Sequence, residues 1–359
     1  MIEIQDIINQ FGEEFLRTNW LYPVQRKAFS AIGHCRTASM GAHIDVCNEC
    51  GYEKISYNSC RNRHCPKCQT VAKEQWIEKQ NQDLLNIGYF HVVFTMPNEL
   101  NSIVYPNQKL VYKLFFKAVS ETLHQLCADK KYLGATPGIT AVLHTWGQNL
   151  MYHPHIHCIV TGGGLTKDGK WQVSRKKFFL PVKVLSRKFR GKFLSFLKQA
   201  NLLLDATLYT KEWVVYCKPP FKSAAKVIEY LGRYTHRVAI SNKRILDLTN
   251  GQVTFSWRDY RDNNQKKNMT ILATEFIRRL MMHVLPSGFR KIRHYGILAP
   301  RNKSVKIALC KKLTNTVSSN VIQLDAIERL RKILGADFDL CPCCRTGRLT
   351  RASPAAEIA

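Results

Sequence analysis

The sequence predicts an α+β protein with a mostly antiparallel central sheet and flanking helices, preceded by a small metal-binding domain. Strand-like and helix-like segments are mixed along the chain, without the regular alternation typical of a parallel sheet. Asn250-Gly251, between two strand-like segments, is the turn dipeptide most typical of a β-hairpin. Residues 34–70 are dense in cysteine and histidine, which indicates a metal-stabilised module before the sheet.

Composition limits the function classes. The chain has 359 residues, 45% of them hydrophobic, which is enough for two or three globular domains. Lysine and arginine outnumber aspartate and glutamate by 54 to 26, a formal net charge of +28. A polyanion relieves the repulsion within such a chain, so nucleic acid is the expected partner. The basic residues are not confined to one amphipathic helix, and no apolar stretch spans a bilayer, so no membrane partner is expected.

The elements follow from periodicity and turn signals along the chain. Helices are expected at 1–33, 70–86, 107–128, 184–209, 223–237, 272–284 and 321–334. Strands are expected at 89–97, 138–147, 155–165 and 212–217, and in hairpins at 165–173 and 243–259. Residues 285–298 form a basic stretch with no assigned element. The first twenty residues lack the basic and apolar regions of a secretory signal, so a soluble cytoplasmic protein is expected.

The cysteine-rich segment predicts zinc. Thirteen cysteines in a chain without a secretory signal favour metal binding in a reducing compartment over disulfides. Two Cys-x-x-Cys knuckles are expected to hold one ion through four thiolates: Cys47, Cys50, Cys65 and Cys68. The spacing leaves open whether four further residues hold a second zinc ion or surround the first: Cys35, His43, Cys60 and His64. Arg61, Arg63 and Lys67 lie among these ligands and are expected to contact DNA phosphate, although a purely structural zinc module also fits.

Another cysteine group, Cys341, Cys343 and Cys344, lies near the C-terminus and has the form of half a zinc knuckle. The sequence leaves open whether it completes a site with distant ligands or binds no metal. The predicted domains are 1–75, with the N-terminal helix and the zinc-binding segment, then 86–285 as the catalytic domain, and 286–359 as a basic region with the cysteine-rich end.

A His-x-His pair suggests a second kind of metal site. Side chains alternate between faces in a strand, so His155 and His157 share one face and Ile156 points to the other. Two imidazoles about 7 Å apart at Cα can bind one ion. His153 would lie about 13 Å from His157 and is expected to be an outer group that contacts phosphate. The alternative is a buried histidine pair without metal.

Two tyrosines could reach the same site. Tyr230 and Tyr234 are four residues apart on a predicted helix and therefore share a face. This pattern fits core packing as well as a shared active site. Basic side chains crowd the region, and a cationic setting favours phenolate; those expected to contact DNA are Lys226, Arg233 and Arg237.

Three segments, in the order "SCRNRHCPKCQ", "HPHIHCIVTGGG" and "YLGRYTHRVAISN", carry a family resemblance. They resemble the two-tyrosine rolling-circle transposases of bacterial insertion sequences (insertion sequence 91 type), within the His-hydrophobe-His (HUH) endonucleases. The resemblance implies an HUH-like fold after a zinc-ribbon-like domain, in a bacterial protein that is nucleoid-associated while it acts on DNA. It implies single-stranded DNA at transposon ends, and target DNA, as partners.

The resemblance also implies the chemistry. His155 and His157 would hold Mg²⁺ or Mn²⁺, and Tyr230 or Tyr234 would attack the scissile phosphate to leave a 5′-phosphotyrosine and a free 3′-OH. His236 is the expected third ligand, with His144 and Gln148 as other candidates. No nucleotide cofactor is expected, because a tyrosyl phosphodiester conserves the bond energy and no Walker-type loop is present. Two other functions fit the residues: a metal-dependent DNA hydrolase without a covalent intermediate, and a non-catalytic zinc-ribbon DNA-binding protein.

Overall fold

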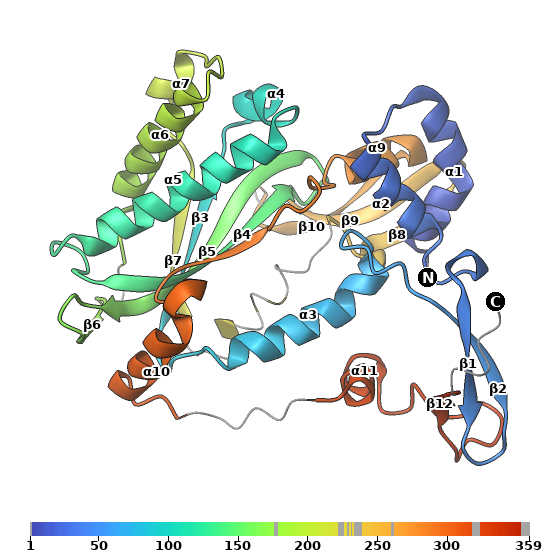
Figure 1. The fold of residues 1–359 in the computed structure, drawn as a ribbon. Helices are drawn as coiled ribbons and strands as arrows, with labels where there is room; N and C mark the ends of the chain where they lie inside the picture. Colours follow the sequence, from blue (N-terminus) through green and yellow to red (C-terminus); the bar gives the residue numbers. More distant parts are fainter. Residues whose placement is uncertain are drawn as a thin grey trace.

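The structure is a computed structural model that describes residues 2–175, 179–221, 226–227, 230, 232, 239–259, 262–317 and 324–352. Within these residues a six-stranded antiparallel sheet lies at the centre, in the order β11-β4-β5-β3-β7, with β6 paired to β5 (Figure 1). Its strands are β3 (Tyr89–Thr95), β4 (Thr136–Trp146), β5 (Tyr152–Leu165), β6 (Trp171–Val173), β7 (Val215–Phe221) and β11 (Ile292–Gly296). The predicted α+β class with an antiparallel sheet is confirmed.

One face of this sheet forms the main hydrophobic core. Helices α5 (Gln108–Ala128) and α6 (Val182–Gln199) cover it (Figure 1). Alternate residues of the central strands point to these helices, among them Phe94 and Ile156, and they meet Phe115 and Phe189. Full burial of each such side chain stabilises the fold by about 1.5–3 kcal/mol.

The opposite face carries the histidines of β3, β4 and β5 and is covered by α3 (Pro66–Asn81) and the segment with Tyr230. Lys226, Val227, Tyr230 and Gly232 are helical, within the predicted 223–237 helix. A Cβ at Gly232 would lie 2.3 Å from Ile77 Cδ1, so the Tyr230 helix crosses α3 in close contact. Two packed elements thus place Tyr230 over the histidine face.

A second hydrophobic core is formed by the N-terminal helices together with residues 239–284. Helices α1 (Ile4–Thr18) and α2 (Pro23–Gly33) pack against α9 (Ala273–Met281) and a sheet of β8 (Ile245–Thr249), β9 (Gln252–Asp259) and β10 (Gln265–Leu272). The predicted hairpin between β8 and β9 is confirmed, with positive φ at Asn250 (51°) and Gly251 (71°). Helices from the first predicted domain therefore share a core with strands from the second.

A smaller sheet joins a strand from the C-terminal part of the chain to two strands from the N-terminal part. In it, β12 (Leu349–Arg351) pairs with β1 (Ala42–Cys47), which pairs with β2 (Glu53–Tyr57). The C-terminal part also contains α10 (Lys303–Leu313) and α11 (Ala326–Leu334). Short elements complete the described chain: η1 (Ala38–Met40), η2 (Asn98–Leu100), α4 (Asn101–Val104), α7 (Thr207–Thr210), η3 (Asn242–Arg244) and η4 (Pro300–Asn302). No helix in the described ranges is both long and apolar enough to cross a membrane.

The sequence prediction differs from the structure at several elements. The helix expected at 184–209 is broken after Gln199, where Asn201 takes a left-handed φ of 56°. The basic stretch at 285–298 contains β11, which pairs with β4 at the sheet edge. The strands β1, β2, β10 and β12 and helix α10 were not predicted, because polar and charged residues interrupt their short apolar patterns.

Candidate active site and metal centres

Three histidines converge on the face of the central strands that α3 and the Tyr230 segment cover. His155 and His157 lie on β5, and His144 on β4 lies directly opposite His155 in the ladder. One ring nitrogen from each lies within 4.8 Å of the others. The predicted pair is therefore joined by His144, one of the candidates for a third ligand. His236, the expected third ligand, lies outside the described residues, and the backbone carbonyl of Gln148 accepts a hydrogen bond from Arg244 (2.6 Å).

The protonation states suit a metal ion. Burial lowers the pKa of His155 to about 4 and that of His157 well below its ordinary value, so both rings are neutral at neutral pH. His155 Nδ1–H donates to the carbonyl of His153 (2.7 Å), which leaves Nε2 as its ligand nitrogen. His153, expected as an outer group that contacts phosphate, thus orients His155 through its backbone. The two neutral imidazoles, with the His144 ring beside them, fit a divalent ion, and imidazole suits Mn²⁺ or Zn²⁺ better than Mg²⁺.

His91 on β3, which the sequence analysis did not single out, links this cluster to the tyrosine. Its Nε2 lies 2.9 Å from His157 Nδ1, and the two rings stack with centroids 5.1 Å apart. Burial, followed by the charges of Lys218 and His155, lowers the pKa of His91 to about 3. The signal in the sequence is a single imidazole inside the apolar strand "YFHVVFT", beside a strand that also carries histidines.

Tyr230 reaches this group from the helix above α3. Its Oη lies 3.2 Å from His91 Nε2 and 3.3 Å from His91 Nδ1, and its ring packs against Phe221. Lys226, one turn earlier, is exposed. Several predicted residues lie outside the described residues: Tyr234, Arg233 and Arg237, together with Ser223 at the expected start of the helix.

The cysteines form two groups of four, and the grouping differs from the expected one. Cys65 and Cys68 lie with Cys35 and Cys60, whereas Cys47 and Cys50 lie with Cys341 and Cys344. The two N-terminal knuckles therefore do not share one site, because β1 and β2 carry the first knuckle away from the second (Figure 1).

The two histidines predicted as possible zinc ligands join neither group. His43 Nδ1 lies 3.2 Å from Asn58 Oδ1, and His64 Nε2 accepts a hydrogen bond from the backbone of Leu285 (3.4 Å). Burial lowers the pKa of His64 to about 3, so this ring is a neutral acceptor at the contact between the zinc module and the segment after α9.

The sulfur geometry fits zinc. In the first group Cys68 Sγ lies 3.7 Å from Cys35 Sγ and 3.6 Å from Cys60 Sγ. Four sulfurs at 2.3 Å from a tetrahedral ion would be about 3.8 Å apart. Hydrogen bonds, that from Cys65 first, lower the pKa of Cys68 to about 5, whereas burial and neighbouring sulfurs raise that of Cys60 to about 12. Thiolates this close repel one another, and a dication removes that repulsion.

Two of the basic residues expected to bind DNA hold the zinc module in place instead. Arg63 donates to the carbonyl of Phe289 (2.6 Å). Lys67 donates to Gln5 (2.6 Å) and forms an ion pair with Glu3. Arg61 is exposed, in a left-handed conformation directly after Cys60, and remains accessible to DNA.

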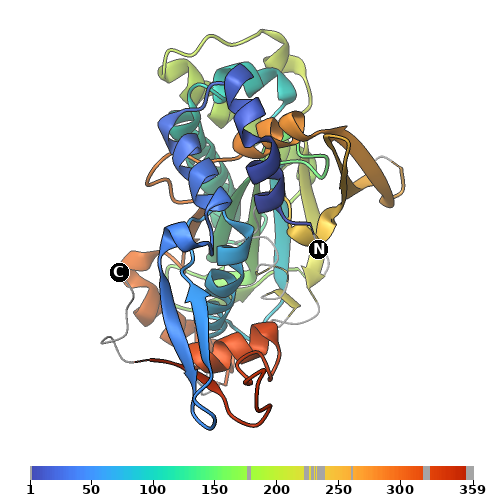
Figure 2. The same ribbon diagram turned by 90° about the vertical axis from the view of Figure 1, so that its right-hand side faces the viewer.

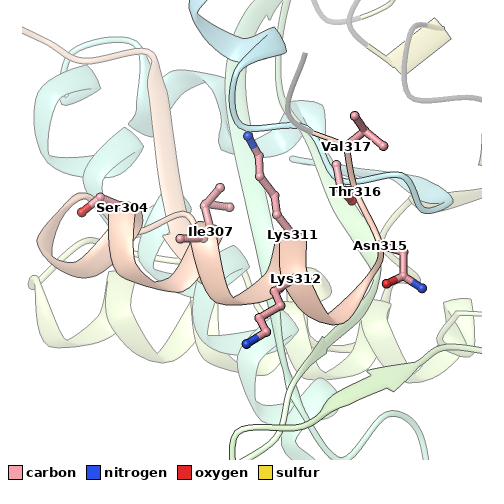
Figure 3. Close-up of a pocket in the computed structure, with 8 residues that line it drawn as sticks. Ser304, Ile307, Lys311, Lys312, Asn315, Thr316 and Val317 are labelled. Carbon is pink, nitrogen blue, oxygen red and sulfur yellow. The ribbon is translucent and has the colours of Figure 1, made fainter. Parts of the chain in front are cut away.

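An open surface hollow lies along α10 and the residues that follow it, away from the histidines (Figure 3). It is lined by Ser304, Ile307, Ala308, Lys311, Lys312, Asn315, Thr316 and Val317. None of these is a histidine, cysteine or carboxylate, so the hollow contains none of the groups that the chemistry above requires.

Comparisons with known proteins agree with these features. Residues 138–306 match the family model Y2_Tnp ("Putative transposase"), and residues 7–96 match Zn_Tnp_IS91, the transposase zinc-binding domain. The first range contains His144, His155, His157 and Tyr230, and the second contains His91 and the first cysteine group.

Two relatives match most of the chain. It is 44% identical over 373 residues to "Putative transposase y4qJ" of Sinorhizobium fredii (strain NBRC 101917 / NGR234), a match that covers 97% of this chain and 94% of that protein. It is 29% identical to the transposase for insertion sequence element IS801 of Pseudomonas savastanoi pv. phaseolicola, over 82% of this chain and 75% of that protein. A solved structure of the conjugative relaxase TrwC in complex with oriT DNA shows only a weak likeness, with 13% identity, 62% and 71% coverage of the two chains and a TM-score of 0.28.

Proposed function

This chain belongs to the family of insertion-sequence transposases that carry an IS91-type zinc-binding domain, and we propose that it nicks and joins single-stranded DNA at transposon ends through a 5′-phosphotyrosine intermediate. Of the two tyrosines, Tyr230 is the one that the structure describes, and it is the proposed nucleophile for the first cleavage. Tyr234, on the same predicted helical face, is proposed to perform a second cleavage that leads to strand transfer.

One chain of contacts carries this proposal. Tyr230 Oη contacts His91, and His91 contacts His157, which belongs to the three-histidine group. The partner of this phenol is an imidazole that itself contacts a possible metal ligand, which favours a role in the chemistry over packing alone. The proposed nucleophile contacts a ring that can orient it, and that ring contacts the proposed metal site, an arrangement that suits covalent phosphoryl transfer.

The tautomers follow from the ligand role of His157. If Nε2 of His157 binds the ion, its ring proton is on Nδ1 and donates to His91 Nε2. The proton of His91 is then on Nδ1, which lies 3.3 Å from Tyr230 Oη. The low pKa of His91 keeps this ring neutral, so its N–H can donate to the phenolate oxygen as it forms. His91 therefore positions Tyr230 and stabilises its ionised form.

A divalent ion held by His144, His155 and His157 would supply Lewis-acid stabilisation to the scissile phosphate, worth several kcal/mol. In the proposed step the Tyr230 Oη–P bond forms and the P–O3′ bond breaks. The phenolic proton leaves to solvent, and the departing 3′-oxygen takes a proton from solvent. Rejoining reverses these events with a 3′-OH as the nucleophile, so no external energy source is needed.

An oligonucleotide assay tests the proposal. Single strands with the ends of the element are incubated with the purified protein and Mn²⁺, and covalent adducts are separated on a denaturing gel. We expect an adduct with the wild type and with a Tyr209→Phe control, since Tyr209 lies exposed on α7, on the opposite side of the sheet from the histidines. The double variant Tyr230→Phe/Tyr234→Phe should form none.

Other results would point to other functions. Cleavage that persists in the double variant would indicate hydrolysis without a covalent intermediate. Binding without cleavage, in Mn²⁺ or Mg²⁺, would indicate a DNA-binding protein without catalytic activity. Either result would refute the proposed tyrosine chemistry.

A further inference from the structure

The N-terminal and C-terminal parts of the chain meet at the second cysteine group, which neither family match spans. Cys47 and Cys50 belong to the zinc-binding match, whereas Cys341 and Cys344 lie beyond residue 306, where the other match ends. We infer that these four thiolates hold a second structural zinc ion, which clamps the C-terminal end of the chain to the N-terminal ribbon. We refer to these four residues as the zinc clamp.

The sulfur positions fit a tetrahedral ion. Cys47 Sγ lies 3.7 Å from Cys344 Sγ, and Cys50 Sγ lies 3.7 Å from Cys341 Sγ. The four sulfurs all lie within 4.8 Å of one another. These separations are too long for disulfides, whose sulfurs are about 2.05 Å apart, and close to the roughly 3.8 Å expected around zinc. Cys47 and Cys344 are 297 positions apart in the sequence, and Cys50 and Cys341 are 291 apart. Their convergence is therefore not a local effect of one Cys-x-x-Cys turn.

Both halves of the clamp have the backbone of a metal knuckle. In each half a backbone N–H points at the first sulfur: that of Glu49 at Cys47 (3.5 Å) and that of Cys343 at Cys341 (3.4 Å). Such N–H groups stabilise negative charge on sulfur. The residue after each second cysteine has positive φ, 69° at Gly51 and 59° at Arg345. Two segments distant in sequence thus adopt the same turn.

The two halves of the clamp are also in direct contact with each other. A Cβ at Gly347 would lie 2.5 Å from Cys47 Sγ, so only glycine allows this approach. Asn48 and Arg348 exchange hydrogen bonds, from the Asn48 backbone to the Arg348 carbonyl (3.1 Å) and from the Arg348 backbone to Asn48 Oδ1 (2.6 Å). The pairing of β12 with β1 continues this contact, and Figure 2 shows the C-terminal segment in red beside the blue ribbon.

The clamp has a mechanical consequence for the rest of the molecule. The segment before it carries α11, where Arg329 forms an ion pair with Glu78 of α3 (2.9 Å). The neighbouring Ile77 contacts Gly232 in the helix of Tyr230. A bound ion would therefore fix α11 on the helix that supports the proposed nucleophile, and the complete ribbon would form only after β12 has been synthesised.

Thiol alkylation of the unaltered protein tests the clamp. Cys50 and Cys343 are both exposed, but only Cys50 is a proposed ligand. Iodoacetamide should modify Cys343 in the zinc-loaded protein about tenfold faster than Cys50, with sites identified by mass spectrometry, because a metal-bound thiolate is shielded. Chelation should remove the difference without any reductant, which separates metal binding from disulfide formation. Equal rates for the two cysteines in the zinc-loaded protein would overturn the inference.

Metal counting provides the second test. By elemental analysis, the double variant Cys341→Ser/Cys344→Ser should contain one zinc ion per chain fewer than the wild type. Cys343→Ser is the matched control from the same turn and should keep the wild-type content. A wild-type content of one ion, or a double variant with the wild-type content, would contradict the clamp. If the double variant does not fold, the alkylation rates of the wild type still decide the question.

Discussion

Replacement of His91 by glutamine should separate the two roles proposed for this ring. In the proposed arrangement, the change removes the single ring that both accepts from His157 Nδ1 and donates to Tyr230 Oη. Loss of a partner that orients a metal ligand typically lowers metal affinity by 10–100-fold. Loss of a hydrogen bond to a charged group costs about 1.5–3 kcal/mol, which is roughly 10–150-fold in rate if the phenolate forms in the transition state.

The assay is single-turnover adduct formation on an end oligonucleotide over a series of Mn²⁺ concentrations. His91→Gln should shift the half-saturating Mn²⁺ concentration upward by 10–100-fold and should lower the rate at saturating Mn²⁺ by at least about tenfold. His124→Gln is the matched control, because His124 lies on α5, on the other face of the sheet. If His91→Gln showed the wild-type rate and an unshifted Mn²⁺ curve, the contact from Tyr230 through His91 to His157 would have no catalytic role.

Three further changes probe the site and the fold. His144→Ala removes one of the three proposed ligands and should weaken Mn²⁺ activation at least as strongly as His91→Gln, measured by the same titration. Burial lowers the pKa of His283 to about 4, below its ordinary value of 6.5, so the unfolded chain binds more protons between these values and the free energy of unfolding falls with decreasing pH. The loss from this group is about 1.6 kcal/mol between pH 6.5 and 5; it should be absent in His283→Gln, and equal pH slopes of the two proteins in urea denaturation would contradict it. With a net charge of +28, binding of single-stranded DNA should weaken steeply between 50 and 200 mM salt, and a flat response in fluorescence anisotropy would argue against a phosphate-binding surface.

Local sequence patterns were sufficient for part of the site. The period of two along β5 placed His155 and His157 on one face, and Asn250-Gly251 gave a hairpin, because both features depend only on neighbouring residues. His144 remained one candidate among several and His91 was not recognised. Both depend on which strands lie on either side of β5, a long-range property that spacing along the chain does not encode.

The grouping of the cysteines also could not be predicted from spacing along the chain. A Cys-x-x-Cys turn indicates half of a zinc site but does not indicate its partner, and three such halves can be paired in more than one way. Proximity in sequence favoured pairing Cys47 and Cys50 with Cys65 and Cys68. The structure instead joins Cys47 and Cys50 to cysteines almost 300 positions away, because β12 adds to the free edge of β1.

The site depends on the register of the central sheet more than on any single side chain. His91, His144 and His157 come from three different strands, and they meet only because β3 and β4 flank β5 with fixed pairing. A slip of one residue would move the histidines to the apolar face and carry Ile156 out of the core. Burial of the phenylalanines under α5 and α6 therefore protects the geometry of the histidine group on the opposite face, since a slip by one residue would cost core burial as well as disperse the imidazoles.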